Sequence, residues 1–386
     1  MKVLLLGEFS GLHTELAKGL RVCGVDVFTI SDGDGFKNYP ADIVEKKKNT
    51  RSNLVVKVFR FIVSRFAFKI GLGGLFMFLR HWSKLRYHMT GYDIVEINNP
   101  TFLRCYGNLI LLYISRYVRM HNKHVFLSAM GNDYYVDKFL STFYKTRLAF
   151  LTEKKIHGKE WKRIPHNPWF YKKLNDYLVD VSDAIIPIGY FYQKSYQWSG
   201  KVASVIPTPI DPCRIGTPFN IKEGDIVNIF HGWQKGRLIK GNEVFDRVIN
   251  RVVDKYGSEK VNYQVVSNVP FNEYIKLFRN AHIFIDQLYA DDKGMNGLFG
   301  MAAGKVVFSG FMPESLELFS DYHGERIGIP ASTDEEELFN QFCDLIEHPL
   351  QMNEISHNAV EFVKKNHDFR IVAKMYLEEW ARHYRN

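Results

Sequence analysis

A loop rich in glycine and basic residues follows a predicted buried strand in the second half of the chain. The strand covers residues 226–230, and the loop 231–241 places Arg237 and Lys240 among glycines. A guanidinium and an ammonium held together can grip phosphate oxygens and stabilise the negative charge that builds on a departing phosphate. The loop therefore predicts a diphosphate site with Arg237 and Lys240 as its catalytic cations, and a solvated basic loop is the alternative.

A second glycine-rich turn leads into a predicted helix at residues 294–304. Its first residues are Gly294, Met295 and Asn296. The free N–H groups and the dipole at the start of a helix attract phosphate. These residues are therefore predicted to bind the same anionic ligand.

Short apolar runs alternate with helical lengths along the chain and must position these loops. In the first half the runs are 3–6, 25–30, 94–97, 125–128 and 184–187, with a long helical stretch at 103–120; in the second half they are 226–230, 263–266, 283–285 and 306–308. Strands alternating with helices predict the α/β class, with a parallel sheet covered on both faces. The pattern restarts after Pro207, Pro209 and Pro212, which predicts two doubly wound, Rossmann-like halves.

The length of 386 residues with 46% hydrophobic residues suits two domains. The predicted domains are 1–205 and 206–366, with an amphipathic terminal helix at 367–386 that packs back on the first domain. In doubly wound folds a ligand binds beyond the carboxyl ends of the strands. His231, Gly232 and Val266 lie at such ends and are predicted to bind the ligand that carries the diphosphate.

The net charge of +9 is concentrated in one segment, because no acidic residue occurs between Glu45 and Asp93. Eleven lysines and arginines lie there, interleaved with Phe, Trp and Tyr. This mixture favours an anionic membrane surface for the segment 46–89. A buried aromatic core with solvated charges is the main alternative, and nucleic acid is disfavoured because no nucleic-acid-binding motif accompanies the charge.

Several other classes are excluded by the sequence. The amino-terminal apolar run of four residues is too short for a signal peptide, and no run reaches the roughly 20 residues of a spanning helix. Four scattered cysteines fit neither a disulfide framework nor a zinc site. We expect a cytoplasmic protein without a metal cofactor, held peripherally at the inner face of the cell membrane. The oligomeric state is not predicted.

The order of motifs resembles the donor domain of GT-B glycosyltransferases of family 4. The resemblance lies in the strand and basic loop already described, then 270–274 (PFNEY), 281–285 (AHIFI) and 301–307 (MAAGKVV), and in the linker segments 183–187 and 205–211. In the first half, Gly7 to Gly11 with His13, and Gly131-Asn132-Asp133, resemble the loops on the acceptor side of that family. The resemblance spans nearly the whole chain and implies the GT-B architecture.

What the resemblance implies is transfer of a sugar, with retention, from a nucleotide-diphosphate donor in the second domain to a glycan or lipid-linked glycan acceptor in the first. Bacterial surface-polysaccharide synthesis is the expected setting. Gly11, His13 and Asp133 become acceptor-side residues, and Asp291 takes the place of the first of two family glutamates, as the contact to the sugar. Residue-level alternatives stay open: His231 as a structural histidine, Asp133 as a helix N-cap, and His13 as a packing residue.

Two positions depart from the family pattern. Phe299 replaces the second glutamate, which holds the ribose, so Asp286, Asp292 or Asn296 would have to supply that contact. Met130 replaces a histidine before Gly131. These departures motivate two rival functions, a non-catalytic binding or scaffold protein of the same fold, and an epimerase or phosphorylase that shares the architecture.

Overall fold

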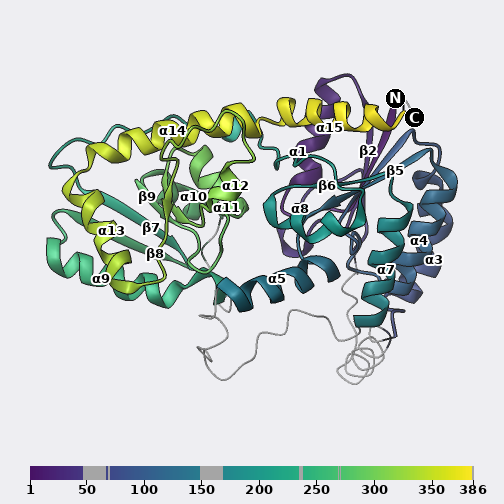
Figure 1. Cartoon of the computed structure of the whole chain (residues 1–386), viewed down its shortest axis with the longest axis horizontal. Coiled ribbons are helices and arrows are strands. Elements are labelled where there is room, and N and C mark those ends of the chain that lie inside the picture. The colour runs from purple at the N-terminus through teal and green to yellow at the C-terminus, as the bar shows by residue number, and fades with distance from the viewer. Residues whose placement is uncertain are drawn as a thin grey trace. The chain divides into compact units, whose positions relative to one another are not determined.

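The computed structural model describes residues 1–46, 67, 70–147, 168–233, 238–267, 269 and 271–384. The chain folds into two compact units (Figure 1). Unit 1 comprises Met1–Pro209 and Phe369–Asn386, and unit 2 comprises Ile210–Asp368. The division thus follows residues 209 and 368, where the sequence predicts boundaries after 205 and 366.

Unit 1 is built on a six-stranded parallel sheet of order β3-β2-β1-β4-β5-β6. Its strands are β1 (Lys2–Leu6), β2 (Asp26–Ser31), β3 (Ile43–Val44), β4 (Ile94–Asn98), β5 (His124–Ala129) and β6 (Ala184–Pro187). Its α-helices are α1 (Leu12–Val22), α3 (Leu75–Leu85), α4 (Asn108–His121), α5 (Tyr134–Arg147), α7 (Pro168–Val181), α8 (Tyr190–Tyr196) and α15 (Phe369–Tyr384). The predicted strands of this half are all present, and β3 is added, a pair of residues too short to form a recognisable run.

Helix α4 begins at Asn108, so the prediction of a helix from residue 103 is wrong at its start. The backbone N–H groups of Gly107 and Leu109 donate to the carbonyls of Gly73 and Gly71, at 2.8 and 3.0 Å. A Cβ atom on Gly107 would lie 2.4 Å from the oxygen of Gly71. The chain at residues 71–73 therefore packs directly against residues 107–109, and the helix begins only at Asn108. The predicted glycine break at 71–74 is present and α3 follows it, whereas a helix predicted before it lies outside the described residues.

Helices cover both faces of the sheet of unit 1 (Figure 1). Leu4, Leu6 and Ile97 face α3, α4 and α7, while Val3 and Leu5 face α1 and α15. This two-sided burial explains why the strands read as continuous apolar runs.

The terminal helix α15 is anchored to unit 1 at two places. It approaches α1 so closely that a Cβ on Gly19 would lie 2.2 Å from the carbonyl oxygen of Phe369. Further along, the indole N–H of Trp380 donates to Oε2 of the buried Glu96 at 3.0 Å, and Oγ of Ser128 donates to Oε1 at 2.5 Å. The terminal helix is therefore part of the core of unit 1.

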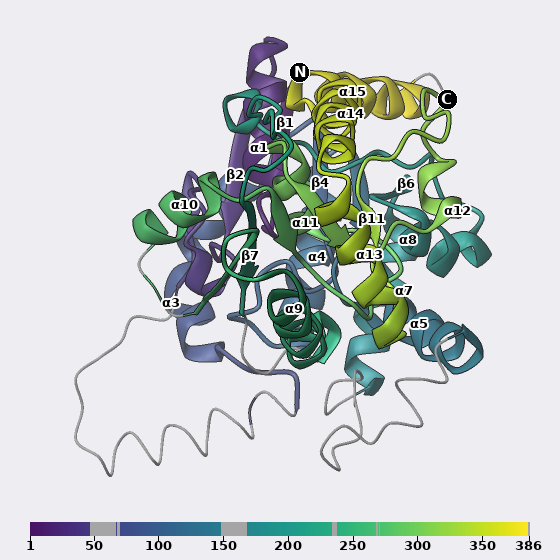
Figure 2. The same ribbon diagram turned by 90° about the vertical axis from the view of Figure 1, so that its left-hand side faces the viewer.

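Unit 2 is built on a five-stranded parallel sheet of order β11-β10-β9-β7-β8. Its strands are β7 (Val227–Gly232), β8 (Val261–Val266), β9 (Ile283–Ile285), β10 (Val306–Ser309) and β11 (Ile329–Pro330). Its helices are α9 (Asn242–Tyr256), α10 (Phe271–Arg279), α11 (Met295–Ala302), α12 (Pro313–Leu316), α13 (Glu335–Glu347) and α14 (Leu350–His367), with a 3-10 turn at Leu238–Lys240. Figure 2 shows α9 beside α13, where Arg247 and Glu335 form an ion pair at 2.5 Å.

Each strand order contains one point at which the chain reverses direction across the sheet. In unit 1 this point lies between β1 and β4, and in unit 2 it lies between β7 and β9. Loops leave the two neighbouring strands in opposite directions there, which opens a crevice at their carboxyl ends. The carboxyl ends of the strands at these two points are therefore the candidate ligand sites.

Glu96 provides a pH test of the packing of α15. Burial raises the pKa of Glu96 to about 8 from 4.5, so the folded protein holds this proton more tightly than the unfolded chain does. Between those two values stability falls as pH rises, by up to about 1.4 kcal/mol per pH unit from this group. We expect Glu96→Gln, which can still accept the bond from Trp380, to unfold in urea with a weaker dependence on pH between about pH 5 and pH 8.

The control is Glu378→Gln, which makes the same substitution at an exposed position of α15. It should keep the wild-type pH dependence. An equal slope for the wild type and Glu96→Gln would contradict the buried, protonated state of Glu96.

Candidate functional site

A buried ion pair lies at the crevice of unit 2. The ammonium of Lys240, which follows β7, is 2.6 Å from Oδ1 of Asp286, which follows β9. Their side chains are 9% and 0% exposed. Ser309, at the end of β10, donates its hydroxyl to Oδ2 of Asp286 at 2.8 Å. One carboxylate thus connects the carboxyl ends of three strands and fixes the predicted phosphate-binding lysine.

The backbone around Lys240 is held against the segment after β9. The N–H groups of Leu288 and Tyr289 donate to the carbonyls of Lys240 and Ile239 at 3.2 and 3.0 Å. A Cβ on Gly241 would lie 2.5 Å from Cβ of Leu288. The position of Lys240 is therefore set by main-chain contacts as well as by its ion pair.

The start of α11 lies against the same carboxylate. A Cβ on Gly297 would be 2.8 Å from Oδ2 of Asp286, so only glycine fits at this contact. Gly294 is the N-cap, and no side chain in the described part of the chain caps the helix. Met295 is half-buried and Asn296 is exposed in the first turn. The predicted helix terminus and Lys240 are thus brought together through Asp286.

His231, Gly232 and Val266 meet at the carboxyl ends of β7 and β8, where Gly232 pairs with Val266. Nδ1 of His231 lies 2.8 Å from the hydroxyl of Tyr263, and Nε2 lies 3.0 Å from Oδ1 of Asn242. Burial lowers the pKa of His231. Both ring nitrogens are engaged within unit 2, which favours the structural role for this histidine.

Other predicted donor residues have different surroundings. Arg237 lies outside the described residues. Asp291 is half-buried next to β10, where its carbonyl accepts from the N–H of Met312 at 3.0 Å. The guanidinium of Arg214 lies 5.4 Å from the ring centroid of Phe299, at the position of the missing glutamate. Because the side chain of Asp286 is fully buried in its ion pair, Asp292 and Asn296 remain as the candidates for a ribose contact.

In unit 1 the loops after β1, β4 and β5 come together. The side-chain amide of Asn99 donates to the carbonyls of Met130 and Asn132 at 2.6 and 3.1 Å. A Cβ on Gly131 would lie 3.1 Å from the ring of Phe9. The predicted acceptor loops are therefore neighbours at one edge of the sheet.

A carboxylate of the chain itself occupies the start of α1. Oε1 of Glu8 accepts from the N–H of Gly11 at 2.9 Å, and Oε2 accepts from the N–H and the hydroxyl of Thr14 at 2.8 and 2.6 Å. Burial raises the pKa of Glu8 to about 7. The N–H groups at this helix start of unit 1 are thus already used by Glu8, whereas among the described residues no side chain caps α11 in unit 2.

His13 and Asp133 are buried, at 2% and 0% exposure. Nδ1 of His13 bonds to the carbonyl of Gly7 at 2.8 Å, and burial lowers its pKa to about 3, so the ring is neutral. Asp133 accepts from the N–H of Val136 at 2.9 Å and caps α5. The geometry favours the packing role for His13 and the capping role for Asp133 over direct acceptor contact.

A charged cluster that the sequence does not reveal lies near the loops after β1, β2 and β4 of unit 1. The guanidinium of Arg104 lies 3.3 Å from Asp32 and 2.6 Å from Asp34, and 4.7 Å from the ring centroid of Phe9. Lys37 bonds to Asp34 at 2.7 Å. Arg104 is separated from these carboxylates by about seventy positions, so no local motif marks the cluster.

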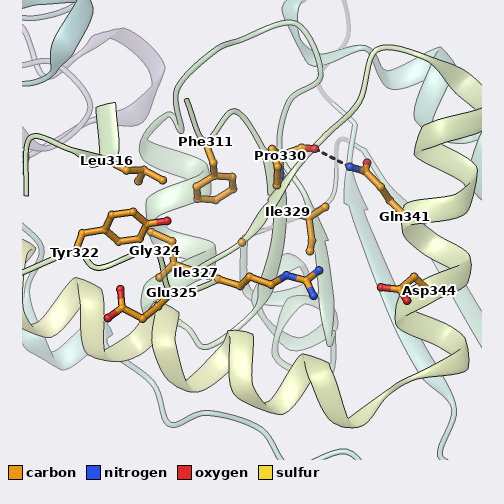
Figure 3. Close-up of a pocket in the computed structure, with 12 residues that line it drawn as sticks. Phe311, Leu316, Tyr322, Gly324, Glu325, Ile327, Ile329, Pro330, Gln341 and Asp344 are labelled. Atoms are coloured by element: carbon orange, nitrogen blue, oxygen red, sulfur yellow. Dashed lines mark hydrogen bonds between the residues drawn. The ribbon is translucent and has the colours of Figure 1, made fainter. Parts of the chain in front are cut away.

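Two further features lie outside the predicted site. A pocket of about 350 Å³ beside β11 is lined by Phe311, Tyr322 and Ile329 together with Gln341, which donates to the carbonyl of Pro330 at 2.9 Å (Figure 3). It contains none of the predicted site residues. Across the part of the chain that the structure describes, no group of three or more His, Cys, Asp or Glu could hold a metal ion.

The ion pair at the crevice of unit 2 can be tested by a double-mutant cycle on stability. Lys240→Met or Asp286→Asn alone leaves one buried charge unpaired, which costs about 3–5 kcal/mol. The double variant leaves neither charge, so its loss should be smaller than the sum of the single losses. Urea unfolding followed by Trp233, the tryptophan of unit 2, measures the effect. Additive losses would contradict a direct Lys240–Asp286 interaction.

The fold is shared with solved structures of distantly related sequence. HepE from Anabaena, in complex with UDP and glucose, is 13% identical with a TM-score of 0.56, and the alignment covers 99% of this chain and 100% of HepE. A glycosyltransferase from Rickettsia africae is 12% identical with a TM-score of 0.53, over 100% of this chain and 98% of that one. A UDP-GlcNAc 2-epimerase from Neisseria meningitidis is 12% identical with a TM-score of 0.51, over 99% and 100% of the two chains.

No protein-family model and no curated protein matches the sequence. The structural likeness, at these identities, shows the fold. It confirms the predicted α/β class and the GT-B fold along the whole chain, while membership of family 4 stays a prediction.

Proposed function

We propose that this protein is a glycosyltransferase that moves a sugar from a nucleotide-diphosphate donor to a glycan or lipid-linked glycan. The observation that carries the proposal is the buried ion pair at the carboxyl ends of the strands of unit 2, where Lys240, fixed by Asp286, lies beside a helix start that no side chain of the described residues caps. Structures of the same fold hold UDP, UDP with glucose, or UDP-glucose. We infer that the diphosphate of the donor binds at this crevice.

The chain's own groups would act on the donor by position and charge. Lys240, together with Arg237, would stabilise the charge on the departing diphosphate, and the N–H groups at the start of α11 would add to this. Asp291 would contact the sugar. We propose retention of configuration, in which the departing phosphate oxygen helps to deprotonate the acceptor hydroxyl and no protein nucleophile is needed.

We place the acceptor at the edge of unit 1, in the setting of surface-polysaccharide synthesis. Contacts of Phe9, Asn99 and Gly131 hold the loops together there. Arg104, paired with Asp32 and Asp34, adds charged hydrogen-bonding groups. Arg104 is 39% exposed while its carboxylate partners are nearly buried. A half-exposed guanidinium can bind hydroxyl or phosphate oxygens of a lipid-linked glycan.

We propose that α3 and α4 bind the anionic inner face of the cell membrane. Neither helix contains an acidic residue, and Arg80, Lys84 and Arg116 are exposed on them. Phe76 is 83% exposed and Met120 is 72% exposed. Exposed apolar and basic side chains together suit the surface of a bilayer. The rest of the basic segment predicted for this role, residues 47–66 and 68–69, lies outside the described residues.

Among the described residues, none of the helices combines the length and the apolar character that a membrane span requires.

An epimerase is the second candidate, because a UDP-GlcNAc 2-epimerase shares the fold over nearly the whole chain. It would convert a nucleotide sugar without an acceptor. A non-catalytic binding protein is motivated by Met130 and Phe299, which replace polar residues of the resembled family. It would bind the nucleotide sugar without turnover.

Ligand-induced thermal stabilisation by UDP and UDP-glucose tests the proposed donor site. We expect both to stabilise the wild type, and Lys240→Met and Arg237→Ala to lower affinity by about 10–100-fold, since each removes a charge-assisted hydrogen bond of about 1.5–3 kcal/mol. Each variant is compared with its own unliganded melting temperature, because Lys240→Met also breaks a buried pair. Exposed Lys260→Met is the matched control. Equal stabilisation of all variants would refute the phosphate assignment.

Product analysis then separates the enzymatic candidates. Transfer to a glycan requires the acceptor, whereas epimerisation proceeds without it. Nucleotide-sugar binding with no turnover under either condition would support the binding protein.

Sedimentation with anionic vesicles tests the surface of α3. The variant Arg80→Glu/Lys84→Glu should lose at least about tenfold in vesicle affinity, because each basic residue contributes about 1 kcal/mol. The control Lys222→Glu/Lys260→Glu changes charge equally on exposed positions of unit 2 and should bind as the wild type does. Equal losses in the two variants would show a dependence on net charge alone.

A further inference from the structure

Unit 2 has a second pocket at the amino ends of its strands, the end of the sheet opposite to Lys240. Its volume is about 470 Å³. Asn228 and Asn262, the second residues of β7 and β8, line it. His282 and Lys305, which directly precede β9 and β10, line it as well. These positions mark the amino ends of the strands, whereas the proposed diphosphate site lies at their carboxyl ends.

Cations line this pocket. Its charged lining residues are Arg279 and Lys305, and no Asp or Glu of the described residues is among the side chains that form it. Lys305 is only 6% exposed. Its ammonium donates to the carbonyls of Arg279 and Ala281, each at 2.7 Å. These two bonds use two of its three N–H donors.

The carbonyls that bind Lys305 lie at the end of α10, so part of the role of Lys305 is to cap that helix. Such a cap supplies partial negative charge but no anion. Accordingly burial lowers the pKa of Lys305 to about 8. A buried lysine without a carboxylate is uncommon, because an ionised group in a protein interior is normally paired.

Further N–H donors surround Lys305. Nδ1 of His282 accepts from the backbone N–H of Asn228 at 3.1 Å, so the neutral ring carries its hydrogen on Nε2. Arg279 is exposed at the pocket, and within the described residues its guanidinium forms no ion pair. Asp225 interacts electrostatically with His282, but it is not part of the lining.

We propose that this pocket is a binding site for a small oxyanion, such as inorganic phosphate or the phosphate group of a phosphorylated metabolite, held by Arg279 and Lys305. A multivalent oxyanion would supply the countercharge that the lining lacks and would accept several N–H donors at once. The site goes beyond the proposed glycosyl transfer, because it lies at the other edge of the sheet and shares no residue with the donor crevice.

Calorimetric titration of the full chain with inorganic phosphate, at constant ionic strength against chloride, tests the site. The wild type is expected to bind phosphate saturably at millimolar concentrations. Arg279→Gln and Lys305→Gln should each weaken binding by about tenfold or more, since each removes a charge-assisted contact. Lys276→Gln removes the same charge from an exposed position of the same helix, outside the pocket, and should bind as the wild type does.

A second arm separates this site from the donor crevice. With the donor site filled by saturating UDP, the wild type should still bind phosphate, while Arg279→Gln should keep stabilisation by UDP. Titration with a sugar phosphate in place of inorganic phosphate then distinguishes a metabolite from the free ion by its affinity. If Lys305→Gln does not fold, Arg279→Gln decides the matter, because its side chain is exposed.

Absence of saturable phosphate binding by the wild type would overturn the proposal. Equal affinity of the wild type and Arg279→Gln, or loss of phosphate binding in the presence of saturating UDP, would overturn it as well, since the anion would then bind elsewhere. None of these results bears on the transfer reaction, which is tested by UDP binding and product analysis.

Discussion

The buried contact between Lys240 and Asp286 is the interaction on which the candidate site of unit 2 depends. An ammonium and a carboxylate removed from water are stable there only because each neutralises the other and Ser309 satisfies the second carboxylate oxygen. The loop after β7, the segment after β9 and the end of β10 are thereby held in one arrangement. Gly297 allows α11 to approach the same carboxylate, so the start of that helix is fixed relative to the lysine.

The two units share a doubly wound topology but have opposite chemistry at their crevices. In unit 1 the buried carboxyl group of Glu8 accepts from the N–H groups of Gly11 and Thr14 at the start of α1. In unit 2 no side chain of the described residues caps the start of α11. This difference, and not the fold, is the reason for placing the diphosphate in unit 2 and the acceptor in unit 1, since one fold supports many activities.

The terminal helix shows how a distant segment completes a domain. Without α15, the indole contact to Glu96 would be absent and the face formed by Val3 and Leu5 would lose Trp380 from its core. Glu96 is tolerated in this apolar surrounding because it is hydrogen-bonded and because burial raises its pKa, which favours the uncharged carboxylic acid. Unit 1 is therefore assembled from both ends of the chain.

The sequence by itself determined the α/β class and nearly every strand, because strands buried on both faces require uninterrupted apolar runs such as residues 3–6 and 283–285. It missed β3 and β11, whose two residues leave no periodic signal, and it placed the start of α4 too early. Tertiary structure decided the surroundings of the site residues. His231, His13 and Asp133 suit either a ligand or a structural bond until their burial is known, and the pairs Lys240–Asp286 and Arg104–Asp34 join positions far apart in sequence. Folding, and not spacing, brings such partners together, since a contact between loops depends on the order of the strands in the sheet.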